Sequence, residues 1–137
     1  MAQSQQETSA DREDRQVLNR LRELARRQHD LNDQLKDLQS ALEAAETEEK
    51  KEEIRRQLQR LQEEQEQILR DTDELQTRMD APENQERMQE QRQQLEQARE
   101  QVQRAAESLQ ERQPTRAAAS GTRAEQSFEE QIGRAHV

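Results

Sequence analysis

Cysteine, tryptophan and tyrosine are absent from this chain, and phenylalanine occurs once, at Phe128. Without cysteine the chain has no disulfide and no thiolate that could bind zinc or attack a substrate. Only 28% of the residues are apolar, whereas ordinary globular domains contain roughly 45–50%. A thick hydrophobic core is therefore excluded, and a thin core is possible only if the apolar residues share a narrow stripe.

Glycine and proline are also scarce, with two of each in 137 residues, so few positions interrupt a helix. No apolar run is long enough to cross a membrane and no signal peptide is visible at Met1, so we expect a soluble segment. The formal net charge is −9, and the arginines are interleaved with glutamates. Nucleic-acid binding is disfavoured, because phosphate contacts need an excess of Lys and Arg on one face.

Helix-forming residues are abundant, above all Gln, Glu, Arg, Leu and Ala. The apolar residues recur at alternating steps of four and three, the heptad pattern of helices that pack along a narrow seam. We expect Leu31, Leu35, Leu58, Leu61 and Val102 to be the most buried. The three stripes consist of Val17, Leu21, Leu24, Gln28, Leu31, Leu35, Leu38, Leu42 and Ala45, then Ile54, Leu58, Leu61, Gln65, Ile68, Thr72, Leu75 and Met79, and finally Met88, Gln91, Leu95, Ala98, Val102, Ala105 and Leu109.

The joint between the first two stripes, Glu46–Glu53, contains no apolar residue. A continuous helix, at about 100° per residue, would carry Ile54 to the face opposite Ala45. Either the seam changes face within one helix or the chain turns here. We favour the turn, although the joint contains no glycine or proline.

The second joint carries stronger signals. Asp80 is placed to cap a new helix, Pro82 falls in its first turn, and Glu83 follows the cap by three residues, which together predict a capping box. The predicted helices therefore span about 11–46, 48–79 and 81–112, after a disordered N-terminus at 1–10.

Folding these helices back on one another pairs residues whose numbers sum to 99 or 100 in the first hairpin and to 163 in the second. The polar seam residues Gln28, Thr72 and Gln91 then share one level, where they can satisfy one another's hydrogen bonds. Gln65 would face apolar neighbours and reach out to solvent. We predict an all-α fold, an antiparallel three-helix coiled-coil bundle plus a truncated fourth helix. The alternative is an extended coiled-coil rod that dimerises with another chain.

The C-terminal part follows a different pattern. Residues 113–121 are rich in small side chains and predict a linker broken at Gly121, and 122–130 predict the start of a fourth helix. The final IGRAHV matches one reading frame of a widely used sequencing-library adapter. The codon before that frame must end in AG, which encodes Lys, Glu or Gln, and position 131 is Gln. We therefore predict that 131–137 is a non-native tail on a truncated gene fragment.

No catalytic, metal-binding or phosphate-binding motif is recognisable, so we expect neither enzyme activity nor a cofactor. His29 lies one residue past the seam and is expected on the surface. The acidic residues within Glu48–Glu53 alternate with lysines and lack the spacing of calcium loops. We expect them to be solvated charges.

Three stretches carry a resemblance to a family: RELARRQHDLNDQLKDLQ (22–39), RMDAPENQERMQEQRQQLEQARE (78–100) and SGTRAEQSFEE (120–130). They resemble helical coiled-coil regions of large, uncharacterised bacterial membrane-anchored proteins that carry a domain of unknown function. The resemblance implies a membrane-associated bacterial parent, whose membrane contact is made by parts outside this chain.

These observations lead to a main functional hypothesis and an alternative. The first is a non-catalytic coiled-coil spacer or protein-interaction segment of a larger bacterial envelope protein, whose partners are other helices, within the chain or in another copy. The alternative is a self-assembling, membrane-associated stress or remodelling protein built on a long helical hairpin. A regulatory coil of an enzyme whose catalytic part is missing is a further possibility.

Overall fold

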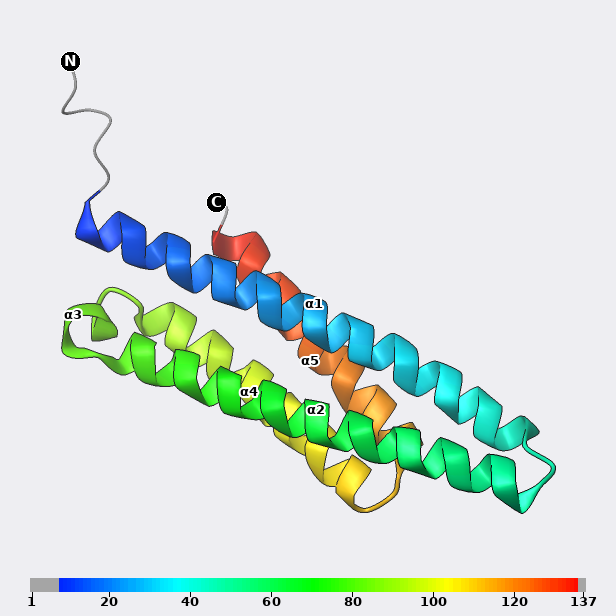
Figure 1. Ribbon diagram of the computed structural model, residues 1–137. Helices are drawn as coiled ribbons and strands as arrows, with labels where there is room; N and C mark the ends of the chain where they lie inside the picture. The colour runs from blue at the N-terminus through cyan, green and yellow to red at the C-terminus, as the bar shows by residue number, and fades with distance from the viewer. Residues whose placement is uncertain (1–7, 136–137) are drawn as a thin grey trace.

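The computed structural model describes residues 8–135, and within this range the chain is helical except for short connections (Figure 1). The predicted N-terminal disorder falls mostly on residues 1–7, and the end of the predicted tail on 136–137, which lie outside the described residues. The helices of the described range are α1 (Ser9–Ala44), α2 (Glu48–Asp80), α3 (Pro82–Gln85), α4 (Gln89–Gln110) and α5 (Pro114–Ala135).

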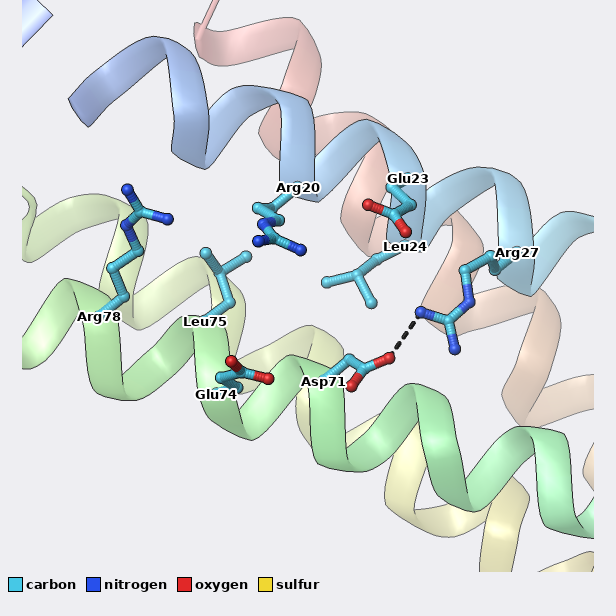
Figure 2. Close-up of a pocket in the computed structure, with 8 residues that line it drawn as sticks. All are labelled: Arg20, Glu23, Leu24, Arg27, Asp71, Glu74, Leu75 and Arg78. Atoms are coloured by element: carbon cyan, nitrogen blue, oxygen red, sulfur yellow. Dashed lines mark hydrogen bonds and ion pairs between the residues drawn. The ribbon is translucent and has the colours of Figure 1, made fainter. Parts of the chain in front are cut away.

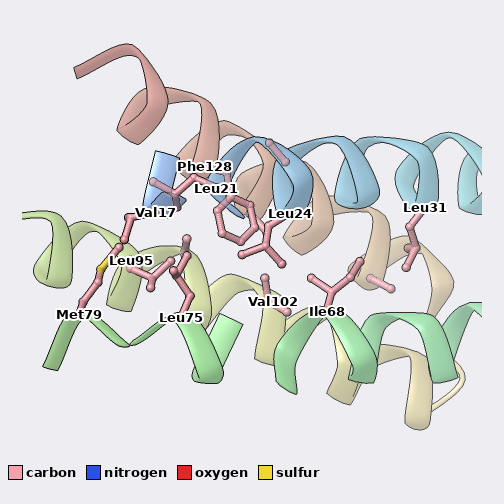
Figure 3. Packing of buried hydrophobic residues seen from close by; sticks show 14 of the residues in the cluster. Val17, Leu21, Leu24, Leu31, Ile68, Leu75, Met79, Leu95, Val102 and Phe128 are labelled. Atoms are coloured by element: carbon pink, nitrogen blue, oxygen red, sulfur yellow. The ribbon is translucent and has the colours of Figure 1, made fainter. Parts of the chain in front are cut away.

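The long helices pack in the order α1, α2, α4, α5, and α5 returns to α1, so each long helix has two neighbours (Figure 1). Their apolar stripes meet along a single cluster of buried side chains, to which α1 contributes Leu21, α2 Ile68, α4 Leu95 and α5 Phe128 (Figure 3). The predicted all-α bundle is confirmed. The fourth helix is a full member of this bundle, and the chain does not adopt the extended rod.

The first reversal lies at Ala45–Thr47, so the chain turns here as predicted. Ala45 leaves the helical conformation, and the side chain of Thr47 caps α2 by accepting a hydrogen bond from the Lys50 N–H at 3.1 Å. Glu48 and Glu49, in the first turn of α2, stabilise the helix because their negative charges lie near the partial positive charge of its N-terminus. A threonine N-cap followed by acidic residues therefore replaces the missing glycine or proline.

At the second reversal Pro82 occupies the first turn of α3, as predicted, but the capping role of Asp80 is wrong. Asp80 is still helical, and Ala81 is extended because the residue before a proline avoids the helical region. No side chain caps α3, so Glu83 completes no capping box. Asn84 instead holds the corner by donating from Nδ2 to the Arg78 carbonyl oxygen at 3.0 Å.

The predicted helix 81–112 is interrupted by a turn at 86–88. Met88, which directly precedes α4, is buried in this turn, with 2% of its surface exposed. No glycine or proline marks this break. α3 and the turn at 86–88 add residues between α2 and α4. Each residue of α4 therefore lies nearer the C-terminal end of α2 than predicted. Arg99 donates to Asp73, whereas the predicted register would have placed Arg99 opposite Glu64.

The third reversal overturns the predicted linker at 113–121. Arg112 takes a left-handed conformation (φ 59°) that ends α4, and the Gln113 N–H bonds back to the Ser108 carbonyl at 2.8 Å, which closes a Schellman-type cap. Pro114 then begins α5, where a proline is favoured. The helix runs without a break through Gly121 and ends at Ala135, beyond the predicted boundary at 130.

Most of the predicted packing residues are buried, which confirms the seams. Leu38, Leu42 and Leu58 are exceptions, since they are only half-buried, and the prediction that Leu58 is among the most buried is wrong. The buried members are Leu21, Leu24, Leu31, Leu35, Ile54, Leu61, Ile68, Leu75, Met79, Met88, Leu95, Val102 and Leu109.

The α1–α2 hairpin continues beyond the connection between α4 and α5 (Figure 1), and the three half-buried leucines belong to this end of the hairpin. Gln39 donates to the hydroxyl of Thr115, in the first turn of α5, at 2.7 Å, so the residues of α1 after Gln39 pass the start of α5. We call this end of the α1–α2 hairpin, residues 38–60, the hairpin tip.

Candidate functional site

A chain of buried amides crosses the bundle from α2 to α1. Gln28 and Gln65 are fully buried and hydrogen-bond each other in both directions, at 3.0 Å and 2.6 Å. Gln28 also donates to Asn32 Oδ1 at 2.9 Å, and Asn32 donates to Glu125 of α5 at 3.0 Å. We call this hydrogen-bonded chain, which consists of the amides of Gln65, Gln28 and Asn32 and ends at the carboxylate of Glu125, the amide relay.

The amide relay replaces the predicted polar layer. Thr72 is buried, but its hydroxyl donates to the Ile68 carbonyl of its own helix at 2.7 Å. Gln91 is half-buried, and its backbone carbonyl accepts a hydrogen bond from Gln131 at 2.9 Å. Gln65, expected to reach solvent, is the true partner of Gln28. The first hairpin turns earlier than the predicted pairing assumed, which moves Gln65 to the level of Gln28.

Gly121 lies where α5 comes closest to the relay. A Cβ atom at this position would stand 2.2 Å from Asn32 Oδ1 and 3.1 Å from Gln28 Nε2. Ala117 and Ala124 on the same face of α5 are fully buried. Small side chains therefore let α5 approach α1 closely, and Gly121 is a packing residue in the middle of a helix rather than a break.

His29 lies at the outer end of the relay, with about half of its side chain exposed, as expected for a surface histidine. Its Nδ1 is 2.9 Å from Glu125 Oε2, and its Nε2 is 3.2 Å from Asp33 Oδ2. The hydrogen bond to Glu125 is the main cause that raises the pKa of His29, with further contributions from the charges of Glu125 and Asp33. Only the protonated ring can donate to both carboxylates.

A shallow pocket of about 180 Å³ lies between α1 and α2, over Leu24 and Leu75 (Figure 2). Across it, Arg27 donates to Asp71 at 2.7 Å and lies 3.4 Å from Glu64. Partial burial opposes the charge of Arg27, but the hydrogen bond that Arg27 donates to Asp71 and the charges of Asp71 and Glu64 raise its pKa overall. The remaining charged residues of the rim are Arg20, Glu23, Glu74 and Arg78.

The arginines of this pocket form hydrogen bonds between α1 and α2. Arg78 donates to Glu13 across the same two helices, and this hydrogen bond is the main cause that lowers the pKa of Glu13. An arginine held by carboxylates is not a general base, and no histidine or hydroxyl nucleophile lines the pocket. The hydrogen bonds of Arg27 and Arg78 therefore hold α1 and α2 together.

The acidic residues at the start of α2 form ion pairs within their own helix. Lys51 lies 3.6 Å from Glu48, Arg55 lies 3.4 Å from Glu52, and Arg56 lies 2.7 Å from Glu53. Among residues 8–135, no group of three or more histidine or carboxylate side chains is arranged to hold a metal ion. Within the same range, every helix is too polar or too short to cross a membrane.

Some of the residues that organise the bundle carried signals that the sequence interpretation missed. Gln28 and Asn32 are one helical turn apart, a spacing at which amides bond to each other. Ala117, Gly121, Ala124 and Phe128 form a stripe at steps of four and three, which marks a helix that begins before residue 122. The helical state of residues 131–135 does not bear on the predicted adapter origin, which stays a prediction.

The fold and these contacts define a bundle of long antiparallel helices with a thin core and a buried amide relay. Comparisons with protein-family models, with curated proteins and with solved structures find no match for this chain.

Proposed function

We propose that this chain is a non-catalytic helical interaction module, in which the bundle holds the hairpin tip in place for contact with partner helices. The observation that carries the proposal is the continuation of the α1–α2 seam past the end of the other two long helices. Leu38, Leu42 and Leu58 follow the heptad stripes but are only half-buried there. An apolar stripe without its full set of neighbours is typical of helices that pair with another helix.

The charged groups elsewhere support a structural role. Arg27, Arg78 and Arg99 each bind a carboxylate on a neighbouring helix. The amides of the relay satisfy one another in the same way. These groups stiffen the base from which the tip projects. We also propose that the module belongs to a larger bacterial envelope protein. This part of the proposal rests only on the resemblance to coiled-coil regions of bacterial membrane-anchored proteins.

Site-specific photo-crosslinking in cells of the source organism tests this function. A photoreactive amino acid is introduced at Ser40 or Gln59, which are exposed positions of the tip, and at the matched exposed positions Gln97 of α4 and Gln126 of α5. We expect adducts at the tip positions whose partner peptides, identified by mass spectrometry, map to helical segments. Equal adduct yields at all four positions would refute the proposal.

A further inference from the structure

The hairpin tip has an open apolar face that lies beyond the contiguous core. The core cluster includes Leu61 as a buried member and Leu38 and Leu58 as partly buried neighbours, but Leu42 and Ile54 are outside it. Ile54 is 8% exposed, so it is covered by α1 and its own helix. On this face, the places that α4 and α5 fill further along the bundle are vacant (Figure 1).

The charges around Ile54 are arranged with opposite signs on its two sides. Glu53, Glu52 and Glu48 precede Ile54 at the same sequence distances at which Arg55, Arg56 and Arg60 follow it. All these residues are exposed in the structure. Turned end for end, this stretch of α2 presents an arginine at the positions of these three glutamates, whereas Glu49 is matched by the uncharged Gln59.

We propose that the hairpin tip binds a second copy of itself, with the first turns of α2 antiparallel across a two-fold axis near Ile54. This inference rests on the proposed function and names its partner. An isologous contact requires one surface that complements itself, and the charges around Ile54 meet that requirement. Glu48, Glu52 and Glu53 of one copy then match arginines of the other copy in charge. Leu42 and Leu58 of both copies share one seam.

The same arrangement completes the packing of the tip. The α1–α2 hairpins of two copies together supply as many helices as surround the core elsewhere in the bundle. The contact is small, because each tip offers only a few turns of helix, and small interfaces of this kind are transient. We therefore expect self-association at chain concentrations on the order of 100 μM, weakened by salt because exposed charges contribute to it.

Charge exchange tests the proposal on the whole chain. The first variant carries Arg55→Glu and Arg56→Glu, and the second carries Glu52→Arg and Glu53→Arg. Each variant opposes like charges in its own dimer, whereas a mixture of the two restores opposite charges. The control carries Arg104→Glu and Arg123→Glu, which makes the same change in net charge as the first variant at exposed positions of α4 and α5.

Sedimentation equilibrium over a concentration series measures the association, and circular dichroism confirms that each variant is helical. We expect each tip variant alone to associate at least about tenfold more weakly than the parent chain. The equimolar mixture should recover the parent's association, and the control should match the parent. Recovery on mixing also excludes misfolding as the cause of the loss.

Failure of this inference is distinguishable from failure of the proposed function. A parent chain that stays monomeric throughout the series, or tip variants that associate as the parent does, would overturn the second copy as partner. If the tip of such a monomer still forms crosslinks to another protein, the interaction module stands with a different occupant. If the tip forms no preferential crosslink either, both proposals fail.

Discussion

Replacing Gly121 with alanine should destabilise the bundle, although alanine is the better helix former. The new Cβ would stand 2.2 Å from Asn32 Oδ1, so the Asn32 side chain must move. Movement disrupts the bonds that Asn32 makes with Gln28 and Glu125. Loss of such buried bonds and overpacking cost about 2–4 kcal/mol together, and the gain in helix propensity offsets about 1 kcal/mol. The expected net loss is about 1–3 kcal/mol.

Gly133 provides the matched control, because a Cβ there meets nothing within 4 Å. Gly133→Ala should therefore be neutral or stabilise the chain by up to about 1 kcal/mol, less where the helix end frays. Chemical denaturation of both variants, followed by circular dichroism, gives the two free energies of unfolding. If Gly121→Ala stabilises the chain as Gly133→Ala does, the close approach of α5 to α1 is refuted.

A double variant assigns the cost to a specific contact. Asn32→Ala alone removes partners from Gln28 and Glu125 and should destabilise the chain. In Gly121→Ala/Asn32→Ala the new methyl group no longer meets Asn32 Oδ1. The double variant should therefore lose less stability than the sum of the two single losses. Additive losses would mean that the two residues do not touch.

Four further predictions follow from burial, bonding and charge. Leu61→Ala should cost about 2–5 kcal/mol in chemical denaturation, and the half-buried Leu58→Ala markedly less; equal losses would contradict the projection of the tip. Gln65→Ala should cost about 1–3 kcal/mol by leaving Gln28 Oε1 without its donor, whereas Gln28→Leu/Gln65→Leu should restore most of that loss. Arg112→Gly should stabilise the chain by about 0.5–1 kcal/mol, measured as a rise in thermal midpoint, because glycine adopts the left-handed conformation without strain. The folded-state pKa of His29 is raised above its ordinary value of 6.5, so its stabilising contribution is complete below that value and disappears as the pH rises through the folded pKa; the difference in thermal midpoint between the parent and His29→Gln should shrink across that range, and a pH-independent difference would refute the assigned contacts.

The packing stripes and the reversal at Pro82 could be predicted because each depends on local chemistry. Leu31, Leu95 and Val102 follow the heptad period, and a heptad position faces the neighbouring helix whatever that neighbour is. Pro82 disrupts the helix before it through its own ring. The all-α bundle could therefore be predicted from the pattern of each helix taken separately.

The register between neighbouring helices could not be predicted in that way. Heptad stripes can be mirrored in several registers with similar apolar burial, so the partner of Gln28 depends on where the turn lies. The turn at Ala45–Thr47 and the interruption at 86–88 together set these registers, and neither contains a glycine or proline to mark it. Gly121 was misjudged for a related reason, because small residues suit both a linker and a close helix contact.

The pairing of α1 with α5 has a consequence for how the molecule folds. His29 and Glu125 touch although they are 96 residues apart in the chain. The α1–α2 and α4–α5 contacts, by contrast, close through connections of only a few residues. Loop-closure entropy favours the formation of these two hairpins first. We therefore expect the slow step to be the docking of one preformed hairpin on the other, with the contacts of Gly121 and Glu125 to α1 formed only after the transition state.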